Sequence, residues 1–149
     1  MRKNIALTAM AATLALGACA TTLTPEAEAR LLADVAPEKR PVLEAAGQGA
    51  PGSAVGQLLV GVLFASQCEG IWIDEPVGRY AEAKLDAFKK EGGDIETEAL
   101  KQAIAAFAES HDVDPVDLKD PPIGCPIAEE EIDAGTLTGV LLTREEPAS

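Results

Sequence analysis

Aromatic side chains are scarce in this chain, whose 149 residues include three Phe, one Trp and one Tyr. Enzymes that act on glycans usually stack sugars on aromatic rings. The scarcity therefore argues against a glycosidase, although the many acidic residues would offer the paired carboxylates that glycoside hydrolysis requires. The single tryptophan, Trp72, is a candidate interface residue, because Trp is enriched where proteins bind one another. A place in the hydrophobic core is the alternative for Trp72.

Basic residues are also few, with 12 Lys and Arg against 25 Asp and Glu, for a net charge of −13. Nucleic-acid binding depends on neutralising phosphates with Lys and Arg, so we expect no nucleic-acid partner. The same balance argues against electrostatic binding to anionic lipid head groups. A strongly acidic surface serves solubility, or it faces a basic partner or divalent cations.

The sequence has little that is typical of catalytic or metal sites. It has one histidine, His111, and it lacks the Gly-x-Ser-x-Gly motif of serine hydrolases. It also lacks the Lys-Ser/Thr that follows the glycines of a phosphate-binding loop, and the Cys-x-x-Cys of metal and redox sites. Asp112, Asp114 and Asp117 follow His111 and are weak metal candidates, because their loop lacks the glycine and the glutamate of a calcium-binding loop. We therefore expect no catalytic residue, no cofactor and no metal.

The N-terminal segment has the order of a secretory signal. Arg2 and Lys3 precede the apolar run 5–16, which ends in Leu16-Gly17-Ala18-Cys19. From Ile5 to Ala20 there are 16 residues, fewer than the roughly 20 that a membrane-spanning helix needs. The segment resembles the signal of bacterial lipoproteins, whose lipobox reads Leu-small-small-Cys. This resemblance covers residues 1–19, and the rest of the chain resembles no family that we identify.

The lipoprotein resemblance implies that residues 1–18 are removed and that Cys19 carries a diacylglyceryl group, often with a further N-acyl chain. Several acyl chains anchor a protein stably, whereas one does not. Ala20 rather than Asp follows the cysteine, which implies the outer membrane, with the periplasmic face favoured. An ordinary signal peptide with an incidental cysteine and an uncleaved anchor are the alternatives.

Removal of residues 1–18 would take away two positive charges and change the net charge from −13 to −15. We expect a tether over 19–24, one domain over 25–143 and a flexible tail over 144–149. Extended, residues 20–24 reach about 17 Å at most, so the domain would lie close to the membrane.

With Cys19 lipidated, Cys68 and Cys125 form an even pair in an oxidising compartment, which predicts a disulfide. In the chain-entropy model a disulfide that closes the loop from Cys68 to Cys125 stabilises the fold by roughly 4 kcal/mol. Two buried free thiols are the alternative.

Hydrophobic periodicity predicts a mainly α fold, a small bundle of four to five helices with one disulfide. The expected helices begin at Thr24-Pro25, at Ser53 before the apolar run 54–65, at Val77, at Asp94 and at Pro126. The apolar run 54–65 is expected to be buried, and the helices over 77–91 and 94–110 are expected to form an antiparallel hairpin. The alternative is an α+β fold with a short hairpin near 58–74, pairing 60–64 with 71–73. Residues 137–142 are open to helix or strand.

Together these features predict a lipid-anchored, periplasmic-facing envelope lipoprotein that is not an enzyme. Its expected role is that of a protein-interaction, accessory or structural component with an envelope protein as partner. A small-ligand or cation-binding module that uses the acidic loop is the alternative, and an envelope hydrolase is a third, weaker hypothesis.

Overall fold

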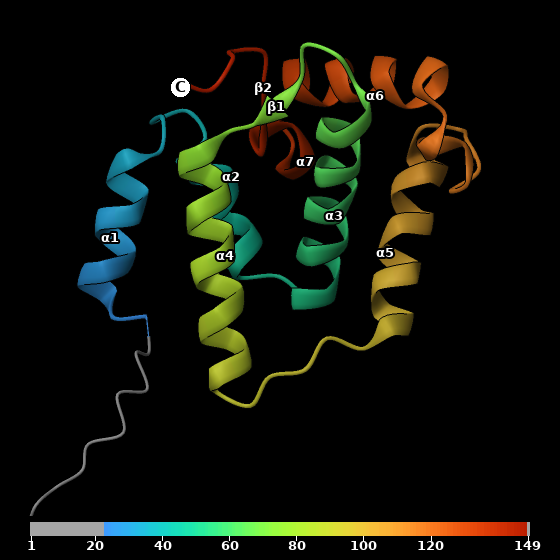
Figure 1. Ribbon diagram of the computed structural model, residues 1–149. Helices are drawn as coiled ribbons and strands as arrows, with labels where there is room; N and C mark the ends of the chain where they lie inside the picture. Colours follow the sequence, from blue (N-terminus) through green and yellow to red (C-terminus); the bar gives the residue numbers. More distant parts are fainter. Residues whose placement is uncertain (1–22, 149) are drawn as a thin grey trace, which may run out of the picture.

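The computed structural model describes residues 23–148, and these residues are mainly helical, as expected (Figure 1). Seven α-helices lie in this part of the chain, and a two-stranded antiparallel sheet joins two segments far apart in sequence. In chain order the elements are α1 (Pro25–Asp34), α2 (Arg40–Gly47), α3 (Pro51–Gln67), β1 (Trp72–Ile73), α4 (Glu75–Lys90), α5 (Thr97–Ser110), a 3₁₀ turn (Asp117–Lys119), α6 (Pro121–Ala134), α7 (Leu137–Val140) and β2 (Leu142–Thr143).

Helix α1 begins as its sequence predicts. The Thr24 hydroxyl accepts a hydrogen bond from the Ala27 N–H at 3.2 Å, and Pro25 occupies the first helical position. The helix packs along α4, and the buried Val35 joins it to the turn before α2. Helix α1 therefore covers one side of α4, whereas α2 packs against α7 and α3 (Figure 1).

Helix α3 shows that residues 54–65 are helical and not a strand. Ser53 does not cap it, contrary to the prediction. The helix begins at Pro51 after Ala50, because proline has a backbone φ suited to the first helical position, and Ser53 lies inside the first turn. The connection between α2 and α3 is correspondingly short, at residues 48–50.

Helix α5 packs against α3 rather than against α4, so the predicted hairpin of two directly packed helices is wrong (Figure 1). The reason is a pair of small-residue surfaces. A Cβ on Gly52 would lie 2.9 Å from the Ala99 Cβ, and one on Gly56 would lie 2.5 Å from the Ala103 Cβ. Without side chains on these glycines the two backbones approach closely.

The start of α5 also differs from the prediction, because Asp94 does not cap it. The helix begins at Thr97 after Glu96, and residues 91–96 form the connection from α4. This longer connection lets α5 cross to the far side of α3 (Figure 1).

The two strands pair antiparallel, with Trp72 opposite Thr143 and Ile73 opposite Leu142. The strand that the α+β alternative placed at 71–73 is present as Trp72–Ile73, but its partner is the C-terminal segment and the hairpin near 58–74 does not form. Helix α4 begins at Glu75 after the N-cap Asp74, two residues before the predicted start at Val77. Residues 137–140 are helical, and the short strand predicted within 137–142 begins only at Leu142.

Helix α6 begins at Pro121, five residues before the predicted start at Pro126, which lies inside the helix. Pro121 and Pro122 occupy its first positions, where proline is tolerated because the N–H groups there have no intrahelical partner. This earlier start places Cys125 one turn into α6. The Cys68 and Cys125 sulfur atoms lie 2.10 Å apart, with 5.5 Å between the Cα atoms, so the predicted disulfide geometry is present.

The core consists of two hydrophobic clusters that share α3 and Ile73. One surrounds Phe64 and Leu118 and joins α3, α5 and α6 near the disulfide. The other surrounds Val77 and Leu141 and joins α2, α4 and α7. Between α3 and α4, beside this second cluster, the packing is open.

Candidate functional site

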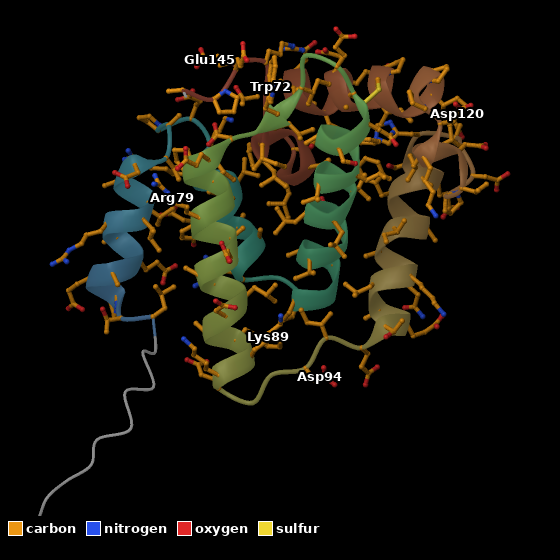
Figure 2. All side chains as sticks on the ribbon, in the orientation of Figure 1. Trp72, Arg79, Lys89, Asp94, Asp120 and Glu145 are labelled. Carbon is orange, nitrogen blue, oxygen red and sulfur yellow. A yellow bond between two sulfur atoms is a disulfide. The ribbon has the colours of Figure 1, made fainter. Side chains whose placement is uncertain are left out.

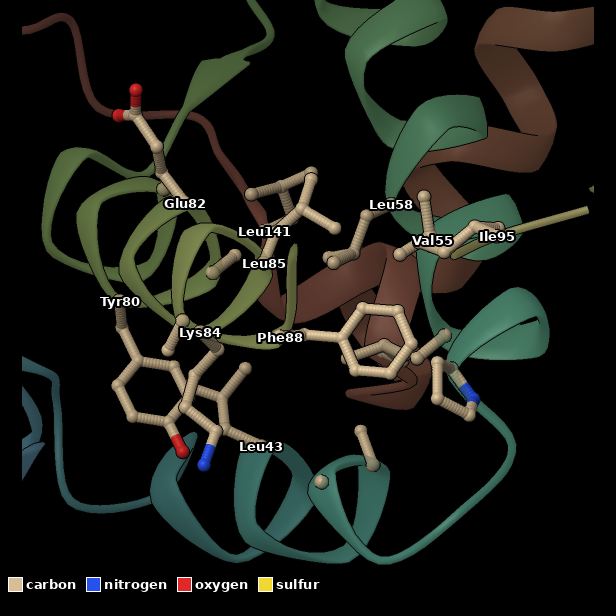
Figure 3. Close-up of a pocket in the computed structure, with 18 of the residues that line it drawn as sticks. Leu43, Val55, Leu58, Tyr80, Glu82, Lys84, Leu85, Phe88, Ile95 and Leu141 are labelled. Atoms are coloured by element: carbon tan, nitrogen blue, oxygen red, sulfur yellow. The ribbon is translucent and has the colours of Figure 1, made fainter. Parts of the chain in front are cut away.

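An apolar cavity of about 590 Å³ lies between α3 and α4 (Figure 3). We call it the α3–α4 groove. Leu137 and Leu141 lie at its floor, α2 contributes Leu43, and the connection before α5 contributes Ile95. The walls come from α3 (Val55, Leu58, Leu59 and Val62) and α4 (Ala81, Leu85 and Phe88).

The α3 wall is an apolar stripe with helical spacing. Val55, Leu58, Leu59 and Val62 stand at i, i+3, i+4 and i+7, which places them on one face of the helix. Leu59 is 44% exposed and Val62 is 50% exposed. The expectation that this apolar run is buried all round is therefore wrong for one face, which has no covering element among residues 23–148.

The α4 wall has the same spacing. Ala81, Leu85 and Phe88 stand at i, i+4 and i+7, and the Phe88 ring reaches toward α3 (Figure 3). These residues form the apolar face of the helix that the sequence predicts over 77–91. What the periodicity did not show is that they face a cavity and not a packed neighbour.

One end of the groove is polar. Glu28 of α1 accepts hydrogen bonds from the Lys84 ammonium and the Tyr80 hydroxyl, each at 2.9 Å (Figure 3 shows Tyr80 and Lys84). The Lys84 hydrogen bond lowers the pKa of Glu28, and the Tyr80 hydrogen bond acts in the same direction against partial burial. Burial raises the pKa of Tyr80, and Glu28 raises it further. The positive charge of Lys84 is thus already paired with the carboxylate of Glu28 within the protein.

The rim of the groove is acidic. Glu82 and Glu91 line it and are exposed, and the Glu82 carboxylate points outward from the cavity (Figure 3). Neither takes part in an ion pair within residues 23–148. Lys89 and Lys90 lie close to Glu91 on α4 but do not line the groove. With Glu28 and Lys84 paired, the charge that the groove presents to an occupant is negative.

Trp72, the predicted interface residue, lies in β1 and is half-buried (Figure 2). It belongs to neither hydrophobic cluster and does not line the groove. Its role in an interface stays a prediction.

The acidic loop does not gather its carboxylates. Asp112 and Asp114 lie between α5 and the 3₁₀ turn, Asp117 is the first residue of that turn, and Asp112 adopts a positive φ of 55°. Within the described residues no three His, Cys, Asp or Glu side chains are placed to hold a metal ion. The structure therefore adds no support for these three aspartates as ligands.

His111 contacts α6 instead of the loop. Its Nε2 lies 2.9 Å from an oxygen of Glu131, a carboxylate that is only 7% exposed. The Thr136 hydroxyl donates to the other Glu131 oxygen and accepts from the Gly139 N–H, so it caps α7. Sequence reasoning did not find this buried network, whose members are separated by up to 28 positions. His111 lies at the end of α5 and Thr136 at the start of α7, and Glu131 of α6 contacts both. The network thus joins three helices, which indicates a structural role.

No family model, no curated protein and no solved structure matches this chain. Cys19 and the segment before it lie outside the described residues. Within residues 23–148 no helix is both long enough and apolar enough to cross a membrane.

Proposed function

We propose that this protein is a lipid-anchored lipoprotein of the bacterial envelope that binds another envelope protein through the α3–α4 groove and catalyses no reaction itself. The observation that carries the binding role is the exposed apolar wall of α3. Exposed apolar patches beside a hollow surface are typical of binding sites in proteins that are otherwise well packed.

The lipid anchor rests on the sequence alone. Leu16-Gly17-Ala18-Cys19 follows a charged start and an apolar run, and Ala20 favours the outer membrane. The described fold starts at Leu23, which lines the groove, four residues after the proposed lipidated cysteine. The groove would therefore lie near the membrane surface, on the periplasmic side, where envelope partners are accessible.

The first test of this proposal is membrane fractionation of the full chain and the Cys19→Ser variant. We expect the wild-type chain in the outer membrane fraction and the variant in the soluble periplasmic fraction. Retention of Cys19→Ser in the membrane would contradict the lipid anchor, and a chain that stays in the cytoplasm would contradict the signal.

The second test is a photocrosslinking amino acid placed in living cells at Leu59, with Val116 as the matched control. Val116 is also apolar and 68% exposed, but it lies in the loop before the 3₁₀ turn and not at the groove. We expect the same protein adduct at Leu59 in repeated experiments and none at Val116. Equal adducts at both positions would contradict a groove-specific partner.

A small-molecule ligand is the second candidate occupant. The cavity of about 590 Å³ has the size and the apolar lining of many ligand sites. Mass spectrometry of the native protein would then find a bound small molecule, and crosslinking at Leu59 would give no protein adduct.

A further inference from the structure

The α3–α4 groove has the geometry of a helix-binding site. Its two walls each present an apolar stripe at i, i+3 or i+4, and i+7, at positions 55–62 on α3 and 81–88 on α4. Each stripe covers seven residue steps, about 10 Å or two helical turns. Two such walls over a shared apolar floor match the apolar face of a third helix, which repeats at the same spacing.

The openness of the groove favours a helix over an acyl chain. Leu59 and Val62 on α3 are about half exposed, so an occupant that buries them must extend out of the cavity and lie along α3. A helix about 10 Å in diameter does so, and its outer face stays in water. A single acyl chain would fill the depth near Leu58 and Leu141 and leave the rim exposed.

The charge of the groove determines the kind of helix. Lys84 is neutralised by Glu28 at 2.9 Å, and Glu82 and Glu91 remain at the rim. An occupant with Lys or Arg beside its apolar face gains from these carboxylates, whereas an acidic one is repelled. A second copy of this chain has the same strongly acidic surface, with −13 for the full sequence, and is therefore disfavoured.

We infer that the groove binds a two-turn amphipathic helix of a partner protein, one with apolar residues at i, i+3 or i+4 and i+7 and with basic residues beside them. This inference rests on the proposed binding function and specifies its partner. Leu59, Val62 and Phe88 contact the apolar face, and Glu82 and Glu91 pair with the basic residues.

The test uses residues 19–149 with Cys19→Ser, because both hydrophobic clusters and the disulfide lie within 23–148. The probe is a fluorescent 16-residue peptide of Leu and Lys, with Leu at helical i, i+3, i+4, i+7 spacing. Two matched peptides serve as controls: one with the same composition in scrambled order, and one with Glu in place of Lys. Binding is measured by fluorescence anisotropy at physiological salt.

We expect the amphipathic Lys peptide to bind at least tenfold more tightly than either control peptide. Leu59→Glu and Val62→Glu should each weaken binding at least tenfold, and Glu82→Lys should weaken it severalfold and reduce its salt dependence. Val116→Glu and Glu109→Lys, matched changes away from the groove, should alter binding less than twofold. Helical circular dichroism and unchanged melting show that each variant is folded.

Several results would overturn the inference. Equal binding of the ordered and scrambled peptides, or equal effects of Glu82→Lys and Glu109→Lys, would mean general attraction to an acidic protein. Tight binding of a fluorescent fatty acid that Leu58→Glu abolishes, without peptide binding, would assign the groove to acyl chains. Either result leaves the lipid anchor untouched, because membrane fractionation of Cys19→Ser tests it separately.

Discussion

At the scale of single residues, Lys39 joins three distant segments of the chain. Its ammonium lies 2.8 Å from the Asp74 carboxylate and donates to the carbonyls of Val140 and Leu142 at 3.0 and 3.2 Å. Asp74 in turn caps α4 by accepting from the Val77 N–H. One partly buried lysine thus fixes the start of α4 against the C-terminal segment that pairs with β1.

We expect Lys39→Met to lower the free energy of unfolding by about 2 kcal/mol. The substitution removes a charged hydrogen-bond donor and leaves its three partly buried acceptors without that donor. Urea unfolding followed by circular dichroism measures the change. Arg79→Met is the control, since Arg79 is half exposed and its ion pairs with Glu75 and Asp34 are surface pairs. That control should change stability by at most about 0.5 kcal/mol, and an equal loss in both variants would contradict the role of Lys39.

Glu28 makes stability depend on pH in the acid range. Its folded pKa is lowered, mainly by the Lys84 hydrogen bond, so the stabilisation is present above the unfolded pKa of about 4.3 and is lost as the pH falls through the folded value. We expect Glu28→Gln to be less stable than wild type at pH 7, with the difference shrinking toward pH 3. Urea midpoints at several pH values measure this. A difference that stays constant with pH would contradict it, and Glu26→Gln, at an exposed neighbour, should follow the wild-type profile.

At the scale of elements, α3 is the centre of the molecule. It packs against α5 through Gly52 and Gly56, against α6 through Phe64 and against α7 through Gly61, and it presents its remaining face to the groove. The sequence pattern of α3 is apolar on every side because three of its sides have partners and the fourth lines the groove.

The contact between α3 and α5 depends on the missing side chain of Gly56. An added Cβ would lie 2.5 Å from the Ala103 Cβ, so we expect Gly56→Ala to destabilise the fold by about 1–3 kcal/mol, even though Ala favours helix. The double variant Gly56→Ala/Ala103→Gly moves the methyl group to the other helix. Its stability should return to within about 1 kcal/mol of wild type, as thermal melting would show. A double variant less stable than Gly56→Ala alone would contradict direct packing.

At the scale of the whole molecule, the two hydrophobic clusters form one fold because α3 and Ile73 belong to both. The disulfide joins the end of α3 to α6 beside the first cluster, across 57 positions of sequence. It therefore connects the middle of the chain to its C-terminal part.

We expect Cys68→Ala/Cys125→Ala to lose up to about 4 kcal/mol of stability, because the unfolded chain regains the entropy of an open loop. Thermal unfolding with and without reductant measures the loss. Reductant should lower the melting temperature of the wild type and leave that of the double variant unchanged. A wild type that is insensitive to reductant and reacts with thiol probes without denaturant would contradict the disulfide.

Prediction from sequence succeeded where the signal is local. The stripe at Ala81, Leu85 and Phe88 and the Thr24-Pro25 start each involve residues within two or three turns of one another. It failed at three helix starts, because α3, α5 and α6 do not begin at Ser53, Asp94 and Pro126. It also failed where distant segments compete for the same neighbour. Nothing near Trp72 identifies Thr143 as its strand partner, and nothing near Gly93 shows that α5 packs on α3.

The sequence by itself determined the mainly helical fold, the acidic surface and the features on which the proposed lipid anchor rests, because these follow from local spacing and composition. It predicted the pairing of Cys68 with Cys125, and the tertiary structure brings the two together. Only the tertiary structure decided which apolar face stays uncovered. Val55, Leu58, Leu59 and Val62 have the same side-chain chemistry as the buried residues of α3. Whether such a stripe is core or binding surface depends on where the other helices pack, and that is set by contacts between residues far apart in the chain.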